Sequence, residues 1–270
     1  MTTTTAPTTS VPPRSRRSVL GPGFGALLRS EVRLFLREPG NVFFALAFPT
    51  VLILGMGYLI PGLDETITDP GPLEGLRTIV VMIPPVLATA MAAPALTTLP
   101  AAMATYREQG VLKRLSTTPM RPQGVLVVQV IIGVVAFVVA AALALAVFAA
   151  AFDWVAPDEP LMVVLSVVLG AAAVFGVGLL IAAVAAKAST ANAIGMLTYF
   201  PMLFFAGLWT PGPIMPDAVQ TIGSYTPLGA ASQGIEAAWF AGEVPARQLV
   251  VMVVYIAVLY PLAAKLFRWR

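Results

Sequence analysis

Long apolar runs alternate with short charged stretches along the chain, and this pattern predicts a bundle of membrane-spanning helices. About 20 helical residues are enough to cross a hydrocarbon core of about 30 Å. Hydrophobic residues make up 58% of the chain and charged residues 11%, which is far from the composition of a soluble domain. We therefore expect an all-α membrane protein with six transmembrane helices, at 41–60, 78–106, 124–152, 161–186, 190–210 and 248–265.

The residues before the first run form an amphipathic helical pattern. Leu28, Val32 and Phe35 fall on one face of a helix over 24–39. This pattern predicts an amino-terminal interfacial helix that keeps its apolar face in the membrane and its charges in water. The polar residues expected to face away from the membrane are Arg29, Glu31, Arg33 and Arg37.

The remaining segments divide the chain further. Residues 1–22 are rich in Thr, Ser and Pro and predict a disordered cytoplasmic tail, whereas 23–270 form one six-span transmembrane domain. Within 211–246, prolines separate two short apolar pieces, 216–224 and 228–240. We interpret them as short external re-entrant helices before the last span, with Tyr225 and Trp239 at interfacial depth. An ordinary external loop is the alternative.

Two of the predicted spans have unusual composition. The second contains Pro84, Pro85, Pro94 and Pro100, which predict a kinked or locally unwound helix. The fourth is rich in small residues, which favour close contact between helices in a membrane. Its small residues include Ala172, Gly176 and Ala183.

The distribution of Lys and Arg predicts the orientation of the spans. If the amino terminus is cytoplasmic and the spans alternate, every Lys and Arg except Arg77 and Arg247 falls on the cytoplasmic side. We therefore expect a multi-pass protein of the plasma (inner) membrane with both termini cytoplasmic. The basic pI near 9.4 then follows from membrane topology and does not indicate binding to nucleic acid.

Several kinds of chemistry lack the residues that they need. The chain has no Cys and no His, and the predicted spans contain no Asp, Glu or Arg; their one Lys, Lys265, is the last residue of the last span. Ion-coupled transport and intramembrane proteolysis are therefore disfavoured. None of the three lysines follows a glycine, so the chain has no phosphate-binding loop. We expect a non-catalytic chain, whose energy for any active transport comes from a separate ATPase subunit.

The charged stretch from Arg107 to Pro122 lies between the second and third runs, 78–106 and 124–152, and neither run contains a charged residue. Its helical period places Val111, Leu112 and Leu115 on one side. A short rigid helix joined to two spans can convert a push into tilting of those spans. The stretch is therefore a candidate contact for the ATPase, although a plain positively charged cytoplasmic loop explains the spacing equally well.

Two groups of motifs resemble a known family. Glu108–Leu115 followed by Thr118–Pro119 resembles the signature between the second and third spans of type-2 ABC exporter permeases. Phe205–Pro211, Ile214–Pro216 and Pro227–Leu228 are similar to the fifth span and external re-entrant helices of the same family. The resemblance covers most of the chain, from the interfacial helix to the carboxyl terminus.

The resemblance implies a half-transporter with two kinds of partner besides the lipid bilayer. A second copy of the chain would form a homodimer, with a heterodimer as the alternative, and two copies of a separate ABC ATPase would bind ATP and Mg²⁺, so this chain itself binds no cofactor and no metal. The interfacial helix at 24–39 would add a second contact with the ATPase. Residues 107–119 would form a cytoplasmic coupling helix, whose candidate ATPase contacts are Arg107, Glu108, Gly110, Leu112, Lys113, Arg114, Leu115 and Pro119.

In this family the second and fifth spans tend to line the transport path. The implied path residues are Met91, Tyr199, Phe200, Met202, Phe204, Phe205 and Trp209. Methionine and aromatic side chains suit apolar, bulky ligands. The expected function is export of a hydrophobic drug, antibiotic or lipid-like compound. The alternatives are a lipid-linked glycan or cell-wall polymer as cargo, an ion-gradient secondary transporter without an ATPase, and a membrane scaffold that transports nothing.

Overall fold

The computed structural model describes residues 23–68, 71–115, 123–209 and 215–267. The regular secondary structure of this part of the chain is helical, apart from an isolated antiparallel bridge between Thr66 and Arg77. The helices are α1 (Phe24–Arg37), α2 (Pro39–Val42), η1 (Phe43–Ala47), α3 (Phe48–Leu59), η2 (Thr78–Met82), α4 (Ile83–Ala93), η3 (Pro94–Thr98), α5 (Leu99–Glu108), α6 (Val111–Leu115), α7 (Gln123–Ala151), α8 (Pro160–Val184), α9 (Ala188–Phe205), α10 (Asp217–Gly223), α11 (Pro227–Phe240) and α12 (Ala246–Leu266).

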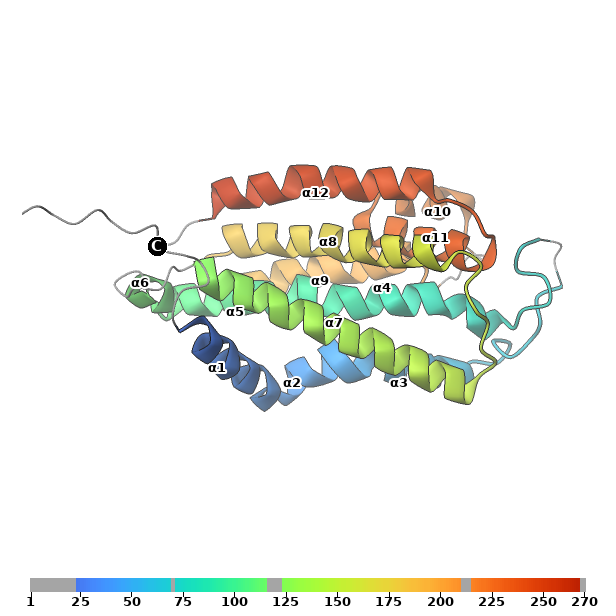
Figure 1. The fold of residues 1–270 in the computed structure, drawn as a ribbon, viewed down its shortest axis with the longest axis horizontal. Coiled ribbons are helices and arrows are strands. Elements are labelled where there is room, and N and C mark those ends of the chain that lie inside the picture. Colours follow the sequence, from blue (N-terminus) through green and yellow to red (C-terminus); the bar gives the residue numbers. More distant parts are fainter. Residues whose placement is uncertain (1–22, 69–70, 116–122, 210–214, 268–270) are drawn as a thin grey trace, which may run out of the picture.

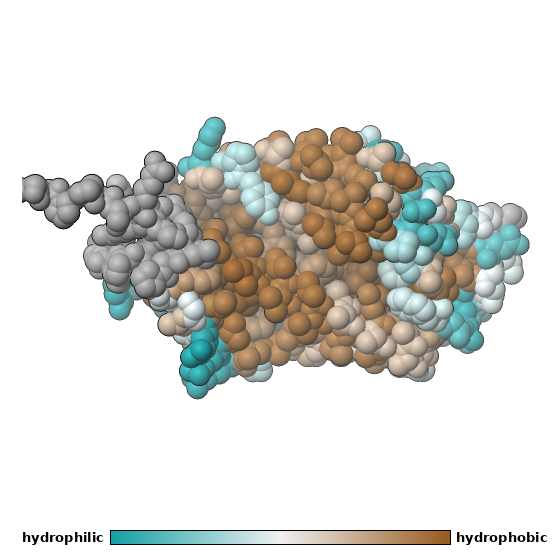
Figure 2. Space-filling view, viewed as in Figure 1, coloured by the Kyte–Doolittle hydropathy of each residue, from teal (hydrophilic) through white to brown (hydrophobic). Residues whose placement is uncertain are grey.

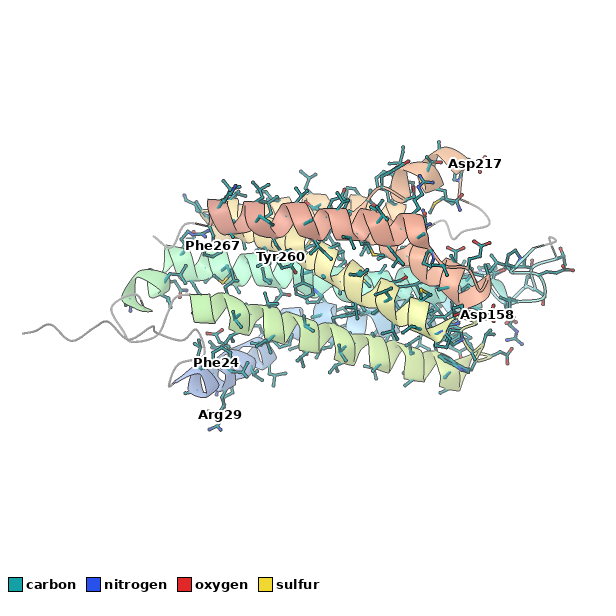
Figure 3. All side chains as sticks on the ribbon, turned by 45° about the horizontal axis from the view of Figure 1, so that its top comes forward. Phe24, Arg29, Asp158, Asp217, Tyr260 and Phe267 are labelled. Carbon is teal, nitrogen blue, oxygen red and sulfur yellow. The ribbon has the colours of Figure 1, made fainter. Side chains whose placement is uncertain are left out.

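The long helices run roughly side by side and give the molecule two distinct ends (Figure 1). The helix α6 lies at one end, whereas α10, α11 and the connecting residues 60–68 and 71–77 lie at the other. A broad apolar band covers the middle of the surface, with hydrophilic residues at both ends (Figure 2). Arg29 and Phe267 mark the α6 end, and Asp158 and Asp217 mark the opposite end (Figure 3). This distribution is typical of a bundle that crosses a membrane.

Five helical segments of the described chain are long and apolar enough to span a membrane: Pro39–Leu59, Thr78–Glu108, Gly124–Ala151, Pro160–Val184 and Ala246–Leu266. The predicted fifth span corresponds to α9, an 18-residue helix that is not among them. Ser189, Thr190 and Asn192 make its first turn polar, and at 1.5 Å per residue it is only about 27 Å long. The crossing by α9, and with it the total of six spans, stays a prediction.

The second span occupies the centre of the bundle, with its apolar stretch entirely buried by other helices. Pro84 and Pro85 lie in the first turn of α4, whereas Pro94 and Pro100 lie at the starts of η3 and α5 within the continuous helical span, where each removes one backbone donor. Between α4 and α5 the chain widens into the π-helical segment η3, where the amide of Leu99 donates to the carbonyl oxygen of Pro94. The predicted local irregularity is therefore a π-helical segment, and the span remains helical throughout.

Helix α8 packs against α4, α5, η3, α11 and α12, and small residues allow this close contact. A methyl group on Gly170 would lie 2.5 Å from Cβ of Ala231 in α11, and one on Gly176 would lie 3.2 Å from Cβ of Leu259 in α12. The hydroxyl of Tyr260 in α12 also donates to the carbonyl oxygen of Ala172 at 3.2 Å. The predicted role of small residues in helix contact is thus visible at Gly176.

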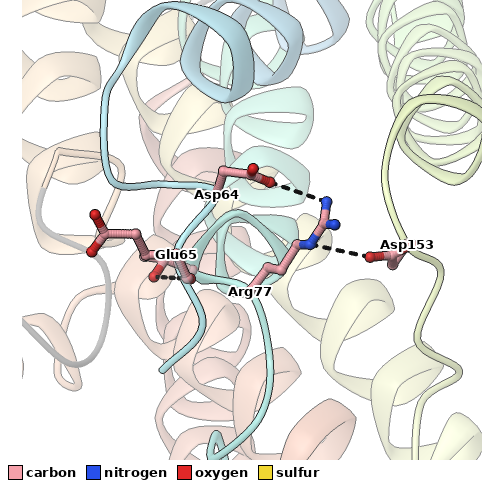
Figure 4. Close-up of polar contacts among 5 residues, drawn as sticks. Asp64, Glu65, Arg77 and Asp153 are labelled. Carbon is pink, nitrogen blue, oxygen red and sulfur yellow. Dashed lines mark hydrogen bonds and ion pairs between the residues drawn. The ribbon is translucent and has the colours of Figure 1, made fainter. Parts of the chain in front are cut away.

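Two ion pairs of Arg77 link connecting segments at the end of the bundle opposite α6. The guanidinium of Arg77 lies 3.0 Å from a carboxylate oxygen of Asp64 and 3.2 Å from one of Asp153 (Figure 4). Asp64 precedes the second span, and Asp153 follows the third. Arg77 therefore joins two connections that are far apart in the sequence, although exposed ion pairs of this kind add little stability.

The structure corrects one expectation about side-chain exposure. Glu31 was expected to face water with the arginines of α1, but it is buried at 7% exposure because polar groups of α5 and α7 surround its carboxyl group. Trp239, for which interfacial depth stays a prediction, is 3% exposed, and its indole N–H donates to the carbonyl oxygen of Val155 at 3.1 Å. Tyr225, in contrast, is exposed.

Candidate functional site

The charged segment after the second span is a sharp turn between two helices. Helix α5 continues to Glu108, and α6 starts at Val111. Gly110 takes a left-handed conformation with φ +66°, which glycine adopts at little cost, and its amide donates to the carbonyl oxygen of Arg107 at 3.1 Å. The single coupling helix expected over 107–119 is therefore wrong at its start, because Arg107 and Glu108 belong to the helix of the second span.

Arg107 and Glu108 hold the junction between α8 and α9. The guanidinium of Arg107 donates to the carbonyl oxygens of Ala182 and Ala185, the latter through Nη1 and the former through Nη2 at 3.1 Å. The carboxylate of Glu108 accepts from the amide of Ala188, the first residue of α9, at 3.0 Å. A cation thus lies at the carboxyl end of α8 and an anion at the amino end of α9. Both charges have the sign that the helix dipoles favour.

The carboxyl-terminal end of the described chain packs on the same group. The ring centroid of Phe267 lies 5.4 Å from Cζ of Arg107, which is within the range of a cation–π contact. We refer to Arg107, Glu108 and their partners Ala182, Ala185 and Ala188 as the α8–α9 clamp. The clamp therefore joins the charged turn to the fourth span and to the predicted fifth span.

The other predicted coupling residues have different environments. Leu112 is 1% exposed, so its side chain fills this chain's own inner face and is not available to a partner. Arg114 is exposed, and its Nη2 donates to the carbonyl oxygen of Gln109 at 3.1 Å. The side chains of Lys113 and Leu115 and the whole of Pro119 lie outside the described residues.

A polar cluster that the sequence did not predict joins the interfacial helix to the bundle. Glu31 of α1 accepts from the hydroxyl of Tyr106 in α5, and the same oxygen, Oε2, accepts from Nε2 of Gln129 in α7 at 2.7 Å. Tyr106 directly precedes Arg107 of the α8–α9 clamp. The cluster therefore connects α1, the second span and the third span within one turn of the charged segment.

Replacement of Glu31 with Leu should detach α1 from the bundle. The change leaves the Tyr106 hydroxyl and the Gln129 amide without their shared acceptor, and a buried polar group without a partner costs about 1–3 kcal/mol. We expect a loss of about 2 kcal/mol in stability and faster amide exchange along α1. Hydrogen–deuterium exchange of the purified protein measures this. The exposed Glu38→Leu variant is the control, and equal protection of α1 in both variants would contradict the assignment.

The predicted path residues fall into three groups by their exposure to solvent. Met91 is fully buried in the core, so it borders no open surface in a single chain. Tyr199 is 6% exposed and packs edge-on against Phe200, with a ring-centroid separation of 5.5 Å. Phe200, Phe204 and Trp209 are exposed, while Met202 and Phe205 are partly buried. Trp209 lies beyond the end of α9. The exposed apolar face of α9 includes Met196, Leu197, Phe200 and Phe204.

The fold and composition define a multi-pass helical membrane protein. The family model of the ABC-2 type transporter matches residues 22–240, and the chain therefore belongs to this family. It is a permease subunit of an ABC transporter, a class of membrane protein that works with an ATPase partner. A comparison with curated proteins gave no match. The matched range includes α1, the charged turn, α9 and the two short helices α10 and α11.

Proposed function

We propose that this permease exports a hydrophobic drug, antibiotic or lipid-like compound, driven by two copies of a separate ATPase that bind ATP and Mg²⁺. The α8–α9 clamp is the observation that carries the proposal. A force applied to α6 passes through Gly110 into the second span, and through Arg107 and Glu108 into α8 and α9. One contact on the cytoplasmic side can therefore reorient three helices together.

The exposed apolar face of α9 supports the proposed cargo and a second copy of the chain. Phe200 is 55% exposed and Leu197 is 77% exposed, although they lie in the middle of α9. We propose that this face meets its equivalent across a homodimer and lines the path together with Phe204, Phe205 and Trp209. In this arrangement α10 and α11 dip into the outer leaflet, and both chain termini are cytoplasmic.

Two alternative functions remain distinguishable by experiment. A lipid-linked glycan needs more hydrogen-bonding groups along its path than the aromatic face of α9 offers, but the family allows such a cargo. Stimulation of ATPase activity by hydrophobic drugs, compared with lipid-linked sugars, separates these two cargoes. A secondary transporter would instead move cargo in liposomes that contain this chain without any ATPase.

Arg114→Glu tests the contact with the ATPase. Arg114 is exposed on α6, and a reversed charge at a protein interface costs several kcal/mol when it meets like charges. We expect drug-stimulated ATPase activity of the reconstituted complex to fall by at least about tenfold, with normal membrane insertion. Lys265→Glu, an equal charge reversal on the exposed end of α12, should leave the activity unchanged. Unchanged activity in Arg114→Glu would place the ATPase contact elsewhere.

A further inference from the structure

A small, mostly apolar cavity with three polar side chains in its wall lies at the end of the bundle opposite α6, where four helices meet. Pro85 of α4, Phe205 at the end of α9, Gln220 of α10, and Gln233 and Glu236 of α11 line it. Ala206, Gly207 and Met215 complete the wall. The cavity therefore lies where the second span meets the predicted fifth span, beside the two short helices.

Glu236 is the titratable side chain among the lining residues. Within the described chain its carboxyl group has no hydrogen bond or ion pair, whereas the neighbouring Gln233 donates from Nε2 to the carbonyl oxygen of Gln220 at 2.9 Å. Burial raises the pKa of Glu236 to about 7. A carboxylate at this position is costly unless a cation or a hydrogen-bond donor compensates it.

The surrounding helices supply no such cation within the cavity. Helices α4 and α8 contain no titratable side chain, and Arg247 of α12 is engaged elsewhere, donating to Oγ of Ser224 at 2.8 Å and lying over the ring of Tyr225 at 4.6 Å. The remaining titratable groups of the helices packed on α11 are Tyr199 of α9, Asp217 of α10, and Tyr255, Tyr260 and Lys265 of α12, and none of them lines the cavity.

We propose that this cavity binds the ammonium group of a hydrophobic amine, with Glu236 as its counter-ion. The cavity volume of about 10 Å³ holds one water-sized group, and a primary ammonium group is of that size. Phe205 and Met215 provide an apolar wall for the attached hydrocarbon. The site rests on the proposed function, since it would receive the polar end of the cargo at the outer end of the path.

The charge of the cavity also separates the candidate cargoes. A carboxylate attracts an ammonium group and repels the phosphate of a lipid-linked glycan, and both effects are strong where water is excluded. Amines with a large apolar body are therefore favoured, and neutral or anionic analogues are disfavoured. The expected selectivity concerns the head group and not the size of the apolar body.

The test uses three fluorescent probes with one dansyl fluorophore and different head groups. Dansylcadaverine carries a primary amine, its N-acetyl derivative is neutral, and dansyl-aminohexanoic acid is anionic. Binding to the full-length permease in nanodiscs is measured without the ATPase. At about pH 8.5 the amine, with a pKa like that of lysine at about 10.4, is protonated while Glu236 is ionised. We expect the amine to bind at least about tenfold more tightly than either analogue.

Variants and pH identify the group responsible. Glu236→Gln should remove the preference for the amine, Glu236→Asp should retain part of it, and the exposed Glu243→Gln should leave it unchanged. In the wild type the preference should disappear at about pH 5.5, where Glu236 is protonated and the amine is still charged. Gel filtration of each variant reports folding, and the Asp variant provides the test if the Gln variant aggregates.

Two results would overturn the site: equal binding of the amine and its acetyl derivative to the wild type, or an unchanged preference in Glu236→Gln. A third result, an amine preference in the wild type that persists at about pH 5.5, would exclude Glu236 as the counter-ion. If the amine binds and its binding depends on Glu236, but no ATP-driven export is observed, the proposed function is overturned and the site is not. ATP-driven export of the amine that is insensitive to Glu236→Gln would overturn the site but not the function.

Discussion

Replacement of Gly178 with Ala is expected to destabilise the bundle by about 3 kcal/mol or more, the upper end of the usual range for overpacking. A Cβ atom on Gly178 of α8 would overlap the carbonyl group of Ala95 in η3. The overlapping atoms belong to the backbone, so rotation of a side chain cannot relieve the clash. Either α8 or the second span has to move, and both are in the centre of the bundle.

Gly55→Ala is the matched control for this prediction. Gly55 also lies within a membrane-length helix, but a methyl group there would meet nothing within 4 Å. Alanine is favoured over glycine inside a helix by about 1 kcal/mol, so Gly55→Ala should be neutral or stabilising. Thermal unfolding of both purified variants in the same detergent makes the comparison. Equal midpoints would show that α8 and η3 are less tightly packed than the structure indicates.

Gly195 of α9 extends the same argument to a second helix. A Cβ atom on Gly195 would overlap the carbonyl oxygen of Leu96, the residue after Ala95. Glycines of α8 and α9 therefore approach two successive carbonyl groups of the π-helical segment. Close backbone contact of this kind permits Cα–H···O interactions and requires small residues in membrane helices. The π-helical segment of the second span is thus in close backbone contact with both α8 and α9.

The order and limits of most long helices could be predicted from the sequence, because the length of an apolar run can be read from neighbouring residues alone. The predicted runs 161–186 and 248–265 differ from α8 and α12 by a few residues at most. The π-helical segment could be anticipated only as an irregularity, because proline positions show where a helix is disturbed and not which hydrogen bonds replace those lost. The 188–205 helix shows the limit of the method, since its polar first turn makes its crossing uncertain by hydropathy alone.

The contacts of the charged turn could not be predicted, because they join residues far apart in the sequence. Helical period placed Leu112 correctly on an apolar face but could not show that the face is covered by the same chain. Arg107 and Glu108 look like solvated charges in the sequence, yet both bind backbone groups about 80 residues away. Glu31 was assigned to the wrong environment for the same reason, since Tyr106 and Gln129 come from other helices.

Arg107→Met is expected to uncouple the permease from its ATPase without unfolding it. The variant loses the donors to the carbonyl oxygens of Ala182 and Ala185, and hydrogen bonds from a charged group contribute about 1.5–3 kcal/mol each. The methionine still fills the space of the arginine stem beside Phe267. We expect drug-stimulated ATPase activity of the reconstituted complex to fall by about tenfold or more, since α8 and α9 no longer follow the turn.

Two further variants show whether the geometry of the α8–α9 clamp is responsible. Arg107→Lys keeps the charge but lacks the planar fork that reaches two carbonyl oxygens, so it should restore only part of the coupling. Glu108→Arg places a cation at the amino end of α9, where the helix dipole disfavours it, and should uncouple as strongly as Arg107→Met. The basal ATPase rate and binding of the ATPase should persist in all three, because the clamp acts within the permease. Full coupling in Arg107→Met would mean that the α8–α9 clamp is not needed and that the buried second span alone moves α9. Loss of ATPase binding in this variant would indicate that Arg107 contacts the ATPase directly.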